Sequence, residues 1–144
     1  MPLTHDHHHA LAQARRMLVA VGNREPDAQL AQAKEFLEFF SQETLQHFRE
    51  EEEVLLPLWV EHVGDLPEPM QEILIEHVRI HAFVRKLSRE VAAGVVNPES
   101  LRELGEALQS HIRKEENQVF PLIEKALSAQ LQSFQLAPRD RGSS

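Results

Sequence analysis

Two stretches of the chain repeat one pattern of residues. Residues 47–57 read HFREEEEVLLP, and residues 111–121 read HIRKEENQVFP. Aligned without gaps, they share His at the first position, Arg at the third, Glu at the fifth and sixth, an aliphatic residue at the ninth and Pro at the eleventh. Each copy therefore contains a His and a Glu four residues apart, a spacing that puts both side chains on one face of an α-helix.

A third pair with the same spacing lies between the two copies. It consists of His77 and His81. Two residues on one helical face can reach a single metal ion, and His and Glu are both common metal ligands. Three successive segments therefore each offer a pair of ligands: His47 with Glu51, His77 with His81, and His111 with Glu115.

Apolar residues recur at helical spacing in four segments of the chain. Short loops with Gly, Asn or Pro separate these segments, which favours antiparallel neighbours, and no stretch has the alternating pattern of a sheet. The sequence predicts an all-α, up-down-up-down four-helix bundle over residues 1–131 and a flexible tail over residues 132–144. The predicted helices run approximately from His5 to Val21, Ala28 to His62, Glu68 to Ala93 and Glu99 to Leu131.

Local signals mark several helix ends. Gly94 is expected to stop the third helix, Asn97 to cap the fourth, and Pro98 to take its first helical position. Pro57 and Pro121 lie late in their helices, and each is expected to kink its helix or end the regular hydrogen bonding.

The His and Glu pairs lie on the apolar faces of their helices. His47 continues the stripe of Phe40 and Thr44, and His77 continues the stripe that contains Ile73. A buried polar group without a partner costs roughly 1–3 kcal/mol, and a bare carboxylate costs more. Imidazoles and carboxylates can be buried together if cations neutralise the carboxylates and bind the imidazole lone pairs.

The first helix is expected to supply one further ligand. At about 100° of rotation per residue, His7 lies within about 40° of the apolar stripe that runs from Leu11 to Val21, whereas His8 lies about 60–140° away. We therefore choose His7 and keep His8 as the alternative. The predicted metal ligands are His7, His47, Glu51, His77, His81, His111 and Glu115.

Five imidazoles and two carboxylates are too many donors for one ordinary ion. They suit two ions bridged by the carboxylates, and this mixture of ligands favours iron, manganese or zinc over calcium or magnesium. The neighbouring Glu52 and Glu116 are expected on a solvated charged face, with hydrogen bonding to a ligand His as the alternative. Phe48 and Phe120 are expected in the core, where they could form a dry wall around the metals.

Composition excludes several classes of protein. The chain of 144 residues has no Cys, which rules out iron–sulfur clusters and thiolate sites, and no Tyr. Its net charge of −8 argues against binding to nucleic acid or to anionic lipid. The absence of a signal peptide and of a long apolar run leads us to expect a cytoplasmic protein that does not enter a membrane.

From about His5 to Leu127, the chain resembles the hemerythrin-like, HHE cation-binding family. That family has a His on the first helix, His-x-x-x-Glu on the second, His-x-x-x-His on the third and His-x-x-x-Glu on the fourth. The chain departs from invertebrate oxygen carriers, which have Asp five residues after the last His. Glu116 occupies that position here, and Glu115 fits the internal repeat better.

The resemblance implies a non-haem di-iron centre with an oxo or hydroxo bridge. One iron would be held by His77, His81 and His111, the other by His7 and His47, and Glu51 and Glu115 would bridge them. The iron with two His would keep an open position for dioxygen or another small diatomic ligand such as nitric oxide.

Several functions stay open at this point. The leading one is the handling or sensing of oxygen, nitric oxide or iron. Alternatives are a di-iron enzyme that decomposes peroxide and an interaction module in which metal only stabilises the fold. No Glu-x-x-His pair and no His-Glu-x-x-His motif occurs, which disfavours ferritin-like oxidase chemistry and a zinc protease.

Overall fold

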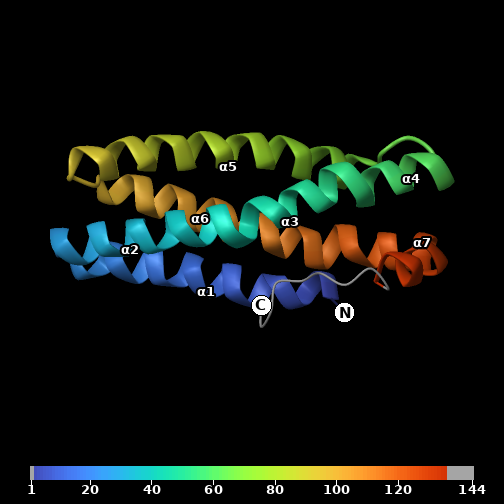
Figure 1. The fold of residues 1–144 in the computed structure, drawn as a ribbon, viewed down its shortest axis with the longest axis horizontal. Helices are drawn as coiled ribbons and strands as arrows, with labels where there is room; N and C mark the ends of the chain where they lie inside the picture. The colour runs from blue at the N-terminus through green and yellow to red at the C-terminus, as the bar shows by residue number, and fades with distance from the viewer. Residues whose placement is uncertain (1, 136–144) are drawn as a thin grey trace.

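The computed structural model describes residues 2–135, with the side chains of residues 7–131 (Figure 1). Four long rods lie side by side along the longest axis, and successive rods run in opposite directions. The described residues contain only helices, turns and loops, so the predicted four-helix bundle is confirmed. None of the helices in this part of the chain is both long enough and apolar enough to cross a membrane.

The first and third rods are single helices, α1 (Pro2–Asn23) and α5 (Glu68–Ala93). The second rod joins α2 (Pro26–Phe39), α3 (Leu45–Glu50) and α4 (Leu56–His62), and the fourth joins α6 (Pro98–Lys114) and α7 (Phe120–Gln135). Helix α1 packs against α2 and α6, α5 packs against α6, and α4 packs against α7. Helix α7 extends past residue 131, and the rest of the predicted tail, residues 136–144, lies outside the described residues.

The predicted signals at the turn between the third and fourth rods are confirmed. Gly94 ends α5 in a left-handed conformation with φ of 81°, which glycine adopts without a steric penalty. Asn97 caps α6 because its side-chain oxygen accepts a hydrogen bond from the backbone N–H of Glu99 at 2.9 Å, and Pro98 follows it. These signals set the tight reversal that keeps α5 and α6 adjacent.

Short π-helical segments interrupt the second and fourth rods. Segments η2 (Glu51–Leu55) and η3 (Glu115–Val119) occupy the same place in the two sequence repeats, and a third, η1 (Phe40–Thr44), lies earlier in the second rod. In η2 and η3 the residue after the segment donates its backbone N–H to the carbonyl five residues earlier.

The prolines account for the position of two of these segments. Pro57 and Pro121 each lie two positions after the last residue of a π-helical segment. In a regular α-helix a proline ring would meet the carbonyl four residues earlier and would remove one hydrogen bond. A widened turn relieves that clash, so the predicted interruption is confirmed, and the rods nevertheless continue through it.

Two apolar cores fill the bundle, one on each side of the His and Glu pairs along the rods. The larger core includes Met17, Phe36, Leu87, Leu104 and Leu108. The smaller core lies toward α4 and α7, and its members include Leu55, Trp59, Met70, Ile123 and Leu127. We call the six buried side chains between them the polar layer: His7, His47, Glu51, His77, His111 and Glu115.

Candidate metal centre

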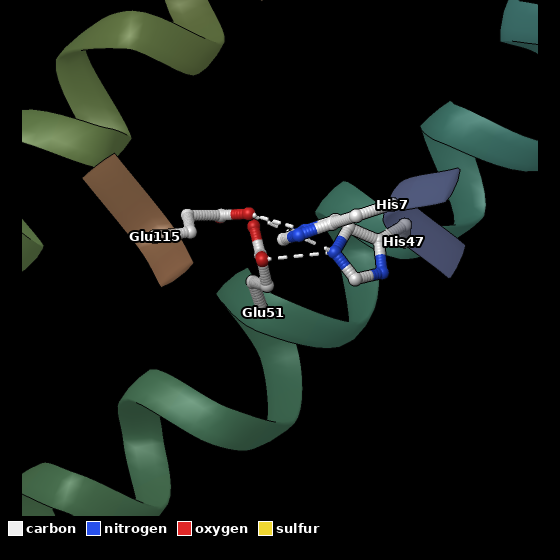
Figure 2. Close-up of side chains that lie close together, drawn as sticks. All are labelled: His7, His47, Glu51 and Glu115. Carbon is white, nitrogen blue, oxygen red and sulfur yellow. Dashed lines mark ion pairs between the residues drawn. The ribbon is translucent and has the colours of Figure 1, made fainter. Parts of the chain in front are cut away.

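Four of the predicted ligands meet where the first, second and fourth rods face one another. Nε2 of His7 lies 2.8 Å from Oε1 of Glu115, and Nε2 of His47 lies 3.0 Å from Oε2 of Glu51 (Figure 2). Figure 2 also shows both carboxylates pointing toward the two imidazoles. One ligand atom from each of these four residues lies within 4.8 Å of the others, and all four residues are buried.

A second group of four shares the same two carboxylates. Nε2 of His77 lies 2.9 Å from Oε1 of Glu51, and Nε2 of His111 lies 3.2 Å from Oε2 of Glu115. Their ligand atoms also lie within 4.8 Å of one another. Glu51 and Glu115 therefore stand between a pair of imidazoles on each side, an arrangement that could hold two metal ions.

The short distances and the poor hydrogen-bond geometry within the polar layer fit metal ions. Imidazole and carboxylate ligands lie about 2.0–2.2 Å from a metal such as zinc, so ligands of one ion are at most about 4.4 Å apart. Glu51 and Glu115 are only 1% and 0% exposed. Within the described residues, their four carboxylate oxygens and Nε2 of His77 and of His111 make no properly formed hydrogen bond. Cations would satisfy these groups.

Three of the imidazoles are oriented by acidic partners on their outer nitrogen. Nδ1 of His77 lies 2.7 Å from Glu52 and Nδ1 of His7 lies 3.1 Å from Glu116. A carboxylate can only accept such a bond, so Nδ1 is the donor, and Nε2 is the ring nitrogen that would be available to a metal ion. Of the two expectations for Glu52 and Glu116, the structure therefore favours the alternative, hydrogen bonding to a candidate ligand His, over a purely solvated face. Their carboxylates are partly exposed yet reach inward to a candidate ligand His.

The third such partner was missed by sequence reasoning. Oε1 of Glu76 lies 2.8 Å from Nδ1 of His111, and its other oxygen lies 2.8 Å from Nζ of Lys114. Lys114 in turn contacts Glu72 at 2.8 Å. Glu72 and Glu76 come from α5 whereas His111 and Lys114 come from α6. The only sequence signal was the i, i+4 spacing of the two Glu residues, which is common on any exposed helix.

Burial and charge act against each other on the innermost pair. Burial alone would lower the pKa of His111, but the adjacent Glu115 carboxylate, together with Glu76, raises that pKa to about 10. Burial alone would raise the pKa of Glu115, yet the positive charge of His111 holds it well below its usual range. Without metal, a proton on His111 thus stabilises the buried carboxylate, and a cation bound at this place would replace it.

Aromatic rings cover two sides of the centre, as the expected dry wall requires. The ring of Phe48 stacks on His77 with centroids 3.8 Å apart, and the ring of Phe120 stacks on His7 at 5.1 Å. Phe48 also meets His111 edge to face. Both phenylalanines belong to the buried apolar cores.

Two of the nine His residues sharpen the ligand assignment. His8 is exposed, whereas His7 is buried in the first group, which agrees with the choice made from helical phase. His81 is half-buried, lies one turn after His77 on α5 and is in neither group found among the described residues. Its ring lies edge-on to Phe40 and Phe48, with centroids 5.6 and 5.9 Å away.

Comparison with known proteins agrees with this geometry. The model of the Hemerythrin HHE cation binding domain matches residues 2–123. Neither the curated proteins nor the solved structures gave a match to this chain. The family match covers most of the chain, including every His and Glu of the polar layer, and the chain therefore belongs to the hemerythrin HHE cation-binding family.

Proposed function

We propose that this protein is a non-haem di-iron protein that binds dioxygen or a related small diatomic ligand, in the handling or sensing of oxygen, nitric oxide or iron. One observation carries the proposal: two buried groups of His and Glu share the carboxylates of Glu51 and Glu115. A single structural ion would not need both groups. When bound, iron would supply the redox chemistry, because protein side chains of this kind have none at neutral pH.

In this proposal the two ions have unequal sets of imidazoles. His7 and His47 hold one ion, whereas His77, His111 and His81 hold the other. His81 has to turn from Phe40 and Phe48 toward the centre to take part, and its place one helical turn from His77 gives it that reach. The ion with two imidazoles retains room for an external ligand.

Iron content and the optical spectrum test the proposal. The metal-free protein would be loaded with ferrous iron without oxygen, separated from free iron, and then exposed to air. We expect two iron ions per chain and a new visible absorption after exposure to air, which reduction removes. A protein that takes up no iron under these conditions would contradict the proposal, and manganese or zinc binding in its place would redirect it.

Two matched pairs of variants test which imidazoles bind. His7→Ala and His77→Ala should each lower the iron content, whereas the adjacent His8→Ala should keep two ions per chain because His8 is exposed. His81→Ala should lower the iron content as well if His81 turns inward. Full iron content in His81→Ala, together with loss in His77→Ala, would remove His81 from the ligand set and leave the others unchanged.

A further inference from the structure

A small cavity lies against the His7 and His47 side of the polar layer. Its wall contains the ligand candidates His7, His47, His111 and Glu115. The other lining side chains include Phe39, Glu43 and Thr44 from the second rod and Leu108 and Ile112 from the fourth. Its volume is about 20 Å³, counted as the space open to the centre of a water molecule. That is room for one or two waters or for one diatomic molecule, and for nothing much larger.

The wall holds a buried hydroxyl that makes no hydrogen bond among the described residues. Thr44 is 5% exposed, and its Oγ1 is buried without a hydrogen-bond partner among the described residues. A buried Thr in a helix can donate to the carbonyl four residues earlier, which here belongs to Phe40. Here the Phe40 carbonyl accepts the backbone N–H of Leu45 at the end of the π-helical segment η1, and Oγ1 of Thr44 makes no hydrogen bond to it. An unsatisfied buried hydroxyl is destabilising and rare in native proteins, so its retention needs an explanation.

The Thr44 hydroxyl lies on the His7 and His47 side of the polar layer, where the proposed ion has fewer imidazoles. Thr44 precedes His47 by three residues and shares the same cavity wall. Apart from the ligand candidates, the other polar group on that wall is Glu43, which is half-buried. A carboxylate only accepts hydrogen bonds and repels anions, so it cannot stabilise an electron-rich ligand. The Thr44 hydroxyl is a donor.

We propose that the Thr44 hydroxyl donates a hydrogen bond to the outer atom of a small ligand bound on the His7 and His47 side, which makes Thr44 a residue that sets ligand affinity and selectivity. This inference rests on the proposed function above. The ligand class is an uncharged diatomic molecule whose outer atom becomes a good acceptor when bound, as with dioxygen or nitric oxide. Carbon monoxide, whose outer oxygen is a poor acceptor, would gain little, and the Glu43 charge disfavours anions such as azide.

The test compares three variants in the iron-loaded, reduced protein. Thr44→Val removes the hydroxyl and keeps nearly the same shape, Thr44→Ser keeps the hydroxyl, and Ser41→Ala removes an exposed hydroxyl from the same π-helical segment. Nitric oxide is the probe, its dissociation rate is followed optically, and the iron content of every sample is measured first. We expect two iron ions in all samples and dissociation about tenfold faster in Thr44→Val, the effect of one lost hydrogen bond. Thr44→Ser and Ser41→Ala should resemble the unaltered protein.

Three outcomes would overturn the assignment, and they separate it from the proposed function. Equal dissociation rates in Thr44→Val and the unaltered protein would show that the hydroxyl does not touch the ligand, while the di-iron proposal stands. Loss of iron from Thr44→Val alone would make Thr44 a support of the metal ligands. An unaltered protein that holds two iron ions but gives no signal with either nitric oxide or dioxygen would remove both proposals.

Discussion

The larger apolar core and the polar layer are built on the same four rods, yet they are stabilised in opposite ways. Burial of the core side chains away from water stabilises the folded state. These apolar side chains need no hydrogen-bond partners to pack. The polar layer buries two carboxylates and four imidazoles, which lose hydration and regain stability only through protons or cations. The comparison teaches that the core specifies the bundle, whereas the layer specifies what the bundle binds.

The largest expected effect comes from damaging the core. Phe36 is fully buried in the larger core, and Phe36→Ala should lower the free energy of unfolding of the metal-free protein by about 3–5 kcal/mol. Urea unfolding measures this change. Val78→Ala is the control, because Val78 is 71% exposed and should change stability by less than about 0.5 kcal/mol. Similar losses in both variants would mean that the core does not carry the fold.

The next largest effect is the increase in the free energy of unfolding when metal binds to the polar layer. We expect the metal-free protein to remain helical and to unfold cooperatively, because a chain of this size can bury a sufficient core without metal. Iron at a free concentration of 100 times its dissociation constant should then add about 2.7 kcal/mol for each site. Thermal unfolding followed by circular dichroism measures both states, with calcium, which prefers oxygen ligands, as the control ion. If the metal-free chain had no helical structure, bound metal and not the apolar core would be what specifies the bundle.

A smaller effect, on iron affinity, should follow from substitution of an acidic residue that contacts an imidazole of the polar layer from outside. Glu76→Gln removes the carboxylate that orients His111, and we expect iron affinity to fall tenfold to hundredfold, or about 1.4–2.7 kcal/mol. Competition with a chelator of known affinity measures it. Glu72→Gln is the matched control, since Glu72 contacts Lys114 but its contacts do not include His111. If the two variants lose affinity equally, the effect is one of surface charge and not of imidazole orientation.

Measured per pH unit, the smallest effect is a pH dependence of the stability of the metal-free protein. Because the pKa of folded His111 is raised to about 10, its contribution to stability is complete below the unfolded value of 6.5 and is lost as pH rises through about 10. One proton gives a slope of at most about 1.4 kcal/mol per pH unit. Urea unfolding from pH 6 to 10 should show this decline in the metal-free protein, and His111→Gln should flatten it. The iron-loaded protein, in which metal replaces the proton, should lack it.

Much of the candidate centre could be predicted because its candidate ligands are paired within helices. The rotation of about 100° per residue is the same in every α-helix, so spacing alone placed His47 with Glu51 and His111 with Glu115. Helical phase also separated His7 from His8. The turn signals at Gly94 and Asn97 are likewise local, and the structure confirms them.

The parts that could not be predicted depend on contacts between rods. The pairing of Glu76 with His111 and Lys114 joins α5 to α6, and nothing in either helix alone indicates it. His81 has the spacing of a ligand but lies beside Phe40, because the second rod brings an aromatic side chain to that level of the bundle. The role of Glu52 could not be decided for the same reason, since its partner His77 lies on another rod.

The sequence by itself determined that four helices form, which face of each is buried and which His and Glu pairs lie on those faces, because these properties follow from the fixed geometry of one helix. Only the tertiary structure decided how the rods are rotated and aligned along their axes. That alignment brings Glu51 and Glu115 between two pairs of imidazoles, and it leaves the Thr44 hydroxyl in a small cavity at their side. Side-chain packing sets this rotation and alignment of the rods, through many contacts that are individually weak and join residues distant in sequence.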